Sequence, residues 1–164
     1  MIYMKFKENN MKSTKVLLTT ALMALIAGPI SAQEKMITFI ELKRAGNLCL
    51  DFVSTGEDEL NSLASHGYKI SKKRKKTSYK KGVGFHLFGA AGIDVFKYSS
   101  GCTINGRGIS QTKGNQVYKE LQNNLVSAGY KRGGKYFKKG GNIISISGSY
   151  VQGSTAVISI YKEN

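Results

Sequence analysis

The side chains that could act as nucleophiles, bases or metal ligands are few in this chain of 164 residues. It contains two histidines, His66 and His86, and two cysteines, Cys49 and Cys102. No pair of them has the spacing of a zinc site, and no acidic loop has the ligand pattern of a calcium site. The glycine-rich stretches also lack the spacing of a phosphate-binding loop. We therefore expect no metal and no cofactor.

A hydrolase would need His86 and Asp94 to meet a serine in space, because triads assemble from distant parts of a chain. No Gly-x-Ser-x-Gly elbow is present. His86 lies between Gly-Phe and Leu-Phe, a setting typical of a histidine that is satisfied within a strand. A cysteine nucleophile would require an unpaired thiol. The inventory therefore predicts that the protein is not an enzyme.

The first 32 residues have the layout of a secretory signal peptide. From Met11 the sequence has a basic start, an apolar run over 16–27 and a small-residue motif that ends at Ala32. The apolar run is shorter than a bilayer crossing requires, and a retained N-terminal anchor is the alternative. We expect cleavage after Ala32, with Met11 as an alternative start, and a mature chain exported to the periplasm or the extracellular space.

Cys49 and Cys102 would then be an even pair of cysteines in an exported chain. In an oxidising compartment an even count favours a disulfide. Such a bond would close a loop of about 50 residues, which the chain-entropy model values at about 4 kcal/mol. The sequence therefore predicts a disulfide between Cys49 and Cys102.

Two stretches of the chain repeat at a spacing near 60 residues. Residues 61–69, NSLASHGYK, align without a gap with 123–131, NNLVSAGYK. After a gap of four, YKKG at 79–82 aligns with FKKG at 137–140. The alternative is that Leu-x-x-x-Gly-Tyr-Lys only marks a helix end before a strand. The alignment predicts two degenerate tandem units, 33–98 and 99–164.

Hydrophobic spacing places a helix before each basic segment. Val117, Leu121 and Leu125 form one apolar helical stripe, and a glycine follows as its C-terminal cap. Leu60 and Leu63 form a shorter stripe in the first unit. Upstream, 37–45 is expected to be a short helix that ends before the glycine at 46, with a strand as the alternative.

Strands follow each basic segment. Apolar residues alternate with serines over 144–150 and again with polar or small residues over 156–160. This alternation predicts an antiparallel hairpin with one buried face. In the first unit the corresponding segment is 83–97, which is richer in glycine.

The predicted fold class is α+β: two degenerate tandem helix-on-antiparallel-sheet units that share a core, after a cleaved signal peptide. One amphipathic helix on a three-stranded sheet buries little, so the two units are expected to pack together. The layout resembles that of secreted beta-lactamase inhibitor proteins and of other exported inhibitor or immunity proteins. The resemblance is one of architecture, and it assigns no functional residue.

Positive charge is concentrated after each predicted helix. The chain has a formal charge of +15, and no acid occurs between Leu60 and Ile93 or between Leu121 and Lys162. The expected partner-binding residues are Lys72, Lys73, Arg74, Lys75, Lys76, Tyr79, Lys80 and Lys81 in the first unit, and Arg132, Lys135, Tyr136, Phe137, Lys138 and Lys139 in the second. The alternative is that these lysines protect exposed edge strands from pairing.

Three kinds of partner suit such a surface. An acidic protein is the first: charge would speed association, and aromatic anchors such as Tyr79, Tyr136 and Phe137 would supply affinity. An anionic envelope polymer or membrane surface is the second, and nucleic acid the third. We expect an exported, non-enzymatic binding protein with an inhibitor or immunity role against an acidic protein. The sequence indicates no oligomeric state.

Overall fold

The computed structural model describes residues 36–86, 89–151 and 155–163. The expected signal peptide, 1–32, lies outside these residues. The described chain contains a helix over 36–54, a 3-10 helix η1 (Leu60–His66) and the helix α2 (Gln111–Ser127). The strands are β1 (Lys69–Lys73), β2 (Lys76–His86), β3 (Gly89–Lys97), β4 (Gly101–Arg107), β5 (Lys131–Gly133), β6 (Tyr136–Lys139), β7 (Asn142–Val151) and β8 (Thr155–Glu163).

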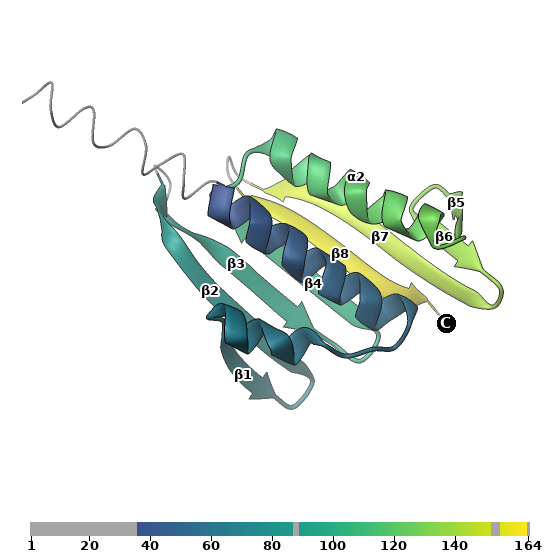
Figure 1. Cartoon of the computed structure of the whole chain (residues 1–164), viewed down its shortest axis with the longest axis horizontal. Coiled ribbons are helices and arrows are strands. Elements are labelled where there is room, and N and C mark those ends of the chain that lie inside the picture. The colour runs from purple at the N-terminus through teal and green to yellow at the C-terminus, as the bar shows by residue number, and fades with distance from the viewer. Residues whose placement is uncertain (1–35, 87–88, 152–154, 164) are drawn as a thin grey trace, which may run out of the picture. The chain divides into compact units, whose positions relative to one another are not determined.

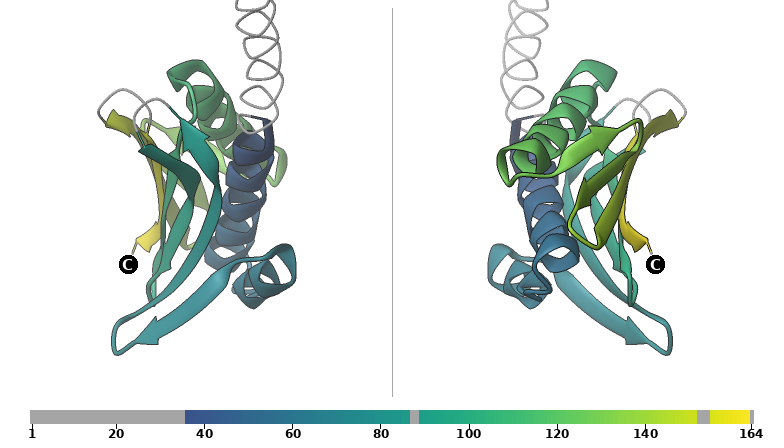
Figure 2. Two further views of the ribbon diagram at one scale, coloured as in Figure 1. Left: turned by 90° about the vertical axis from the view of Figure 1, so that its left-hand side faces the viewer. Right: turned by 90° about the vertical axis from the view of Figure 1, so that its right-hand side faces the viewer.

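The strands form one eight-stranded sheet in the order β1-β2-β3-β4-β8-β7-β6-β5. Every neighbouring pair is antiparallel, so the α+β class predicted from the sequence is confirmed. The two central strands, β4 and β8, come from distant parts of the chain. Figure 1 shows helix 36–54 lying over the sheet between η1 and α2, and Figure 2 shows these helices on the same side of it.

Helix 36–54 is amphipathic over its whole length. Its buried residues recur every three or four positions, as one apolar stripe of an α-helix requires. They are Thr38, Glu41, Leu42, Ala45, Gly46, Cys49, Leu50 and Val53. The expectation that the helix ends before Gly46 was wrong. A Cβ atom at Gly46 would lie 2.9 Å from Leu121 Cδ1 of α2, so this glycine permits a close helix contact instead of ending the helix.

The helix predicted before the second basic segment is confirmed as α2. Ser110 caps it, since its hydroxyl oxygen accepts a hydrogen bond from the Lys113 amide. Val117, Leu121 and Leu125 are buried, as their spacing predicted. The helix therefore packs its apolar stripe on β7 and β8.

The predicted C-terminal hairpin is confirmed as β7 and β8. Its buried residues include Ile146, Ile158 and Ile160, which point toward the helices. Each expected basic strand, however, is a hairpin of two strands. The residues 74–75 turn the chain between β1 and β2, and 134–135 do so between β5 and β6. Each half of the sheet consequently has four strands, one more than expected.

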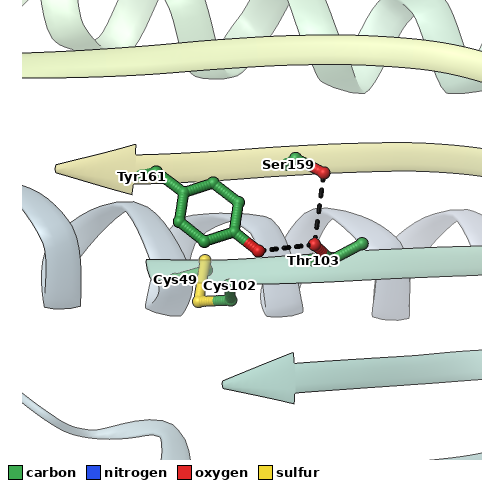
Figure 3. Close-up of a disulfide and its surroundings, with 5 residues drawn as sticks. All are labelled: Cys49, Cys102, Thr103, Ser159 and Tyr161. Atoms are coloured by element: carbon green, nitrogen blue, oxygen red, sulfur yellow. Dashed lines mark hydrogen bonds between the residues drawn. A yellow bond between two sulfur atoms is a disulfide. The ribbon is translucent and has the colours of Figure 1, made fainter. Parts of the chain in front are cut away.

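The predicted disulfide joins Cys49 of helix 36–54 to Cys102 of β4 (Figure 3). Both cysteines are fully buried. The bond therefore ties the helix that lies over the middle of the sheet to one of the two central strands.

Removing this bond should weaken the fold. The cysteines are 53 positions apart, and the chain-entropy model values a loop of that size at about 4 kcal/mol. We expect the double variant Cys49→Ala/Cys102→Ala to lose free energy of unfolding on that order, measured by urea unfolding at pH 7. Reduced wild-type protein is the control that separates the bond from the packing of the sulfur atoms. Equal unfolding midpoints for oxidised and reduced protein would contradict the prediction.

Candidate functional site

The two basic segments lie at opposite edges of the sheet. Residues 72–76 form the tip of the β1–β2 hairpin, and 131–139 form the β5–β6 hairpin. Because β1 and β5 are the outermost strands, the tips are separated by the width of the sheet, roughly 34 Å at about 4.8 Å per strand. The structure therefore divides the expected basic surface into two hairpins instead of joining it into one patch.

The two hairpins have matching registers. Lys69 pairs with Lys80 in the first, and Lys131 pairs with Lys138 in the second. The next pair in each case places an aromatic residue, Tyr79 or Phe137, on the inner strand. Tyr79 and Phe137 thus occupy matching positions in the two hairpins.

Tyr79 and Phe137 do not lie on the surface, where aromatic anchors were expected. Their side chains are 1% and 0% exposed. Successive side chains of a strand point to opposite faces of the sheet, so these rings enter the core while the next residues, Lys80 and Lys138, remain exposed. Tyr136, at 37% exposed, is the expected anchor that does lie on the surface.

Lys81 and Lys139 make contacts within the protein. Lys81 Nζ lies 3.0 Å from Glu41 Oε1 and 5.6 Å from the centroid of the Tyr68 ring. Lys139 Nζ donates a 2.8 Å hydrogen bond to the Ala128 carbonyl, and it lies 5.7 Å from the Tyr130 ring centroid. Both lysines are therefore on the side of the sheet that the helices cover.

The remaining basic residues of the two hairpins lie mostly on the surface. Lys72, Lys73, Arg74 and Lys75 are exposed, as are Lys80, Arg132, Lys135 and Lys138. Lys76 is half-buried, with its Nζ 4.9 Å from the Phe96 ring centroid. Neither hairpin contains an acidic residue. Among the described residues, the ion pairs are made by lysines and arginines outside this exposed set.

Sequence reasoning missed the face of the sheet that the helices leave uncovered. We call it the bare face. It comprises the alternate strand residues that point away from the buried core, among them Phe96, Tyr98, Thr103, Asn105, Arg107, Tyr136, Ser145, Ser147, Ser149, Val157, Ser159 and Tyr161, with lysines on the outer strands. The alternation in 144–160 predicted a second, polar face of the hairpin, but not which strands would continue it.

A hydroxyl and aromatic cluster lies on the two central strands of the bare face, at the end of the sheet next to the β3–β4 turn. The Thr103 and Tyr161 hydroxyls are hydrogen-bonded at 2.9 Å, and the Thr103 and Ser159 hydroxyls at 3.2 Å (Figure 3). The Tyr98 and Tyr161 ring centroids are 6.2 Å apart. Tyr98 directly follows β3, and the other residues come from β4 and β8, so the central pairing of the sheet brings them together.

Neither an ion site nor a membrane crossing is found in the part of the chain that the structure describes. No group of three or more His, Cys, Asp or Glu side chains there is placed to hold a metal ion. Likewise, none of the helices in 36–86, 89–151 and 155–163 combines the length and apolar character that a bilayer crossing requires.

The chain matches no protein family, and no curated protein or solved structure matches it significantly.

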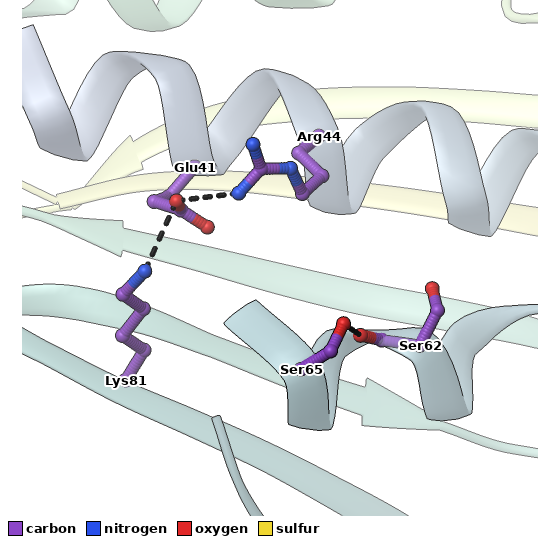
Figure 4. A network of polar contacts seen from close by, with 5 residues as sticks. All are labelled: Glu41, Arg44, Ser62, Ser65 and Lys81. Carbon is purple, nitrogen blue, oxygen red and sulfur yellow. Dashed lines mark hydrogen bonds and ion pairs between the residues drawn. The ribbon is translucent and has the colours of Figure 1, made fainter. Parts of the chain in front are cut away.

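Glu41 is a buried carboxylate held between two cations. Its Oε1 accepts a 2.7 Å hydrogen bond from Arg44 Nη1 and lies 3.0 Å from Lys81 Nζ (Figure 4). Burial alone would raise the pKa of Glu41, but the hydrogen bond and charge of Lys81, with the charge of Arg44, outweigh it and lower the pKa below its ordinary value. This ion pair links helix 36–54 to β2.

The lowered pKa of Glu41 predicts an acid-dependent loss of stability. A group whose pKa is lower in the folded state stabilises the fold above its unfolded pKa, here 4.5, and that stabilisation is lost as pH falls through the folded pKa. At pH 7 we expect Glu41→Gln to lower the free energy of unfolding by about 1–3 kcal/mol, since it leaves a cation without its partner.

Urea unfolding of both proteins between pH 7 and pH 3 tests this prediction. The difference between wild type and Glu41→Gln should shrink below pH 4.5, because the glutamine does not titrate. A difference that stays constant over this range would show that the carboxylate charge of Glu41 does not stabilise the fold.

Truncation should separate the core aromatic residues from the surface one. We expect Tyr79→Ala and Phe137→Ala each to cost about 3–5 kcal/mol of unfolding free energy, because they leave cavities in the core. Tyr136→Ala should change it by only about 0.5 kcal/mol, as surface substitutions usually do. Thermal unfolding of the three variants measures this ranking, and a Tyr136 variant as unstable as the other two would contradict it.

Proposed function

We propose that this is an exported, non-enzymatic binding protein whose partner is an acidic protein, in an inhibitor or immunity role. The observation that carries the proposal is the pair of basic hairpins at the two edges of the sheet, on either side of the bare face. A surface with this charge attracts and orients an acidic protein before contact. Lysines are also used to protect sheet edges from pairing, but edge protection does not require Arg74 and Lys75 at the turn.

The distribution of acids supports this proposal. Most acids of the described chain lie on helices or in the loop before η1: Glu41, Asp51, Glu57, Asp58, Glu59 and Glu120. The described strands contain two acids, Asp94 and Glu163, and both lie on the bare face. Asp94 is paired with Arg107 at 3.4 Å. The bare face with its edges is thus the side from which an acidic protein meets least repulsion.

We also propose that the chain is a degenerate tandem repeat, with η1 and β1–β4 as one unit and α2 and β5–β8 as the other. Support comes from matched positions at the end of each helix. Gly67 and Gly129 both have positive φ, 81° and 88°, and the tyrosine that follows each is buried under a lysine. The unit boundary then falls after β4 instead of between 98 and 99. A repeat explains why both edges of the sheet are basic.

Export is supported by the disulfide. A buried disulfide between Cys49 and Cys102 is compatible with an oxidising compartment such as the periplasm or the extracellular space. A cleaved leader over 1–32 would deliver the chain there. An inhibitor or immunity protein that acts outside the cytoplasm meets secreted enzymes and toxins in that location.

Charge reversal at the first hairpin tests the partner proposal. We expect wild-type full chain, tagged at its C-terminus in the producing cells, to retain one acidic protein at about 200 mM salt as well as at about 50 mM. The variant Lys73→Glu/Arg74→Glu/Lys75→Glu, at three exposed positions, should bind that protein at least about tenfold more weakly by titration, with an unchanged melting temperature.

The matched control reverses Lys113, Lys119 and Lys162, which lie on the side of the sheet that carries the helices. It changes the net charge equally, so it separates the hairpin from the overall field. Retention of nucleic acid or an anionic polymer alone, lost at the higher salt, would contradict the proposal. Equal weakening by both triple variants would show that net charge, and not the hairpin, attracts the partner.

A further inference from the structure

The bare face holds an aromatic side chain in one fixed position. Tyr161 leaves β8 and lies toward β4, where its hydroxyl meets that of Thr103 at 2.9 Å (Figure 3). Gly101, which pairs with Tyr161, has no side chain, and a Cβ atom there would lie 2.7 Å from Tyr161 Cδ1. The ring is thus held at its hydroxyl end by a hydrogen bond, and its Cδ1 edge occupies space that a side chain at position 101 would need.

Other aromatic residues extend this surface on both sides. Tyr98 lies 6.2 Å from Tyr161 between ring centroids, and Phe96 carries the Lys76 ammonium over its ring. Ser145 of β7 pairs with Tyr161 of β8 on one side and with Tyr136 of β6 on the other. Partly exposed aromatic rings therefore lie at several positions from β3 to β6, and serine and threonine side chains lie between them.

A rigid aromatic residue with a hydrogen-bonded hydroxyl is a favourable anchor for a protein partner. Tyrosines are enriched among the residues that contribute most to interfaces. Tyr161 already makes a hydrogen bond within the chain, so holding its ring in that position on binding costs little additional conformational entropy. The lysines of the outer strands lie at the rim, where charge raises association rate more than affinity. The bare face therefore has the centre and the rim of a protein interface.

We propose that the acidic partner docks on the bare face, with Tyr161 and Tyr98 as its central anchor and the two basic hairpins as its rim. The inference rests on the proposed function and places the partner on the central strands of the sheet, at their β3–β4 turn end, instead of on a hairpin tip. Charge complementarity selects an acidic protein over a second copy of this chain, because the lysines of two bare faces would repel each other. The partner must present a carboxylate-rich surface broad enough to span several strands.

Photo-crosslinking in the producing cells tests the docking site. The full chain carries a benzophenone amino acid at Ser147, an exposed position on the bare face that pairs with Ser159. Two further chains carry it at Lys75, on the hairpin tip, and at Val126, which is 50% exposed on α2. We expect one acidic protein, identified by mass spectrometry, to be linked from Ser147 and not from Val126.

The outcomes distinguish this inference from the proposed function. An acidic protein linked from Lys75 but not from Ser147 would overturn the inference and leave the proposed function standing. Equal linkage from Ser147 and Val126 would also overturn it. If Ser147 and Lys75 link only nucleic acid, an anionic polymer or a second copy of this chain, or nothing at all, both proposals fail.

Substitutions then test the anchor with the purified partner. We expect Tyr161→Ala to weaken binding about tenfold or more, as truncation of a central anchor does, whereas Tyr161→Phe, which retains the ring, recovers most of the affinity. Ile40→Ala, at an exposed position of helix 36–54, is the control and should bind as wild type.

Melting temperatures measured on the same samples separate binding from folding. If Tyr161→Ala unfolds, Ser147→Glu replaces it, because it adds a negative charge at an exposed site facing the acidic partner. Full affinity in a folded Tyr161→Ala or Ser147→Glu variant would refute the docking site.

Discussion

The packing of helix 36–54 over the β4–β8 pair is the interaction on which the rest of the structure depends. These two strands come from different halves of the chain, and their pairing unites the halves into one sheet. The helix lies over that seam, where Leu42 packs so close to Gly106 that a Cβ atom there would lie 3.2 Å from Leu42 Cδ1. The Cys49–Cys102 disulfide fixes the helix to the same strand. Without this cover, the apolar residues at the centre of the sheet would face water.

The same constraint explains why we propose the docking site on the other side of the sheet. The three helical elements of the described chain lie on one face, and the apolar residues of the strands pack against them. Lys81 and Lys139 also make their contacts on that face, with Glu41 and with the Ala128 carbonyl. Side chains on the bare face do not pack against the helices. The side chains of Thr103, Ser159 and Tyr161 are therefore constrained by the β4–β8 pairing and by one another, and not by contact with the helices.

Sequence reasoning recovered the features that depend on local patterns. The stripe of α2, the β7–β8 hairpin and the disulfide follow from helical spacing, alternation and an even cysteine count. The predicted helix end before Gly46 was wrong, because a glycine permits close packing as readily as it ends a helix. Only the contact with Leu121, which is distant in the sequence, distinguishes the two cases. Tyr79 was misplaced for a related reason: alternation says that it and Lys80 face opposite sides, but not which side is buried. The bare face depends on pairing between distant strands, which no local pattern specifies.

The disulfide also determines what a protease could release. Trypsin-like enzymes cut after lysine and arginine, and the exposed turn at Arg74 and Lys75 is an open target for them. A cut there falls between Cys49 and Cys102, so the two pieces remain covalently joined through sulfur. β1 and β2, now separate ends, would still be held in the sheet by their mutual pairing and by β3. A protein nicked at its most basic point would thus keep its strand pairing and its bare face, and its two pieces would migrate together on a denaturing gel unless the disulfide is reduced.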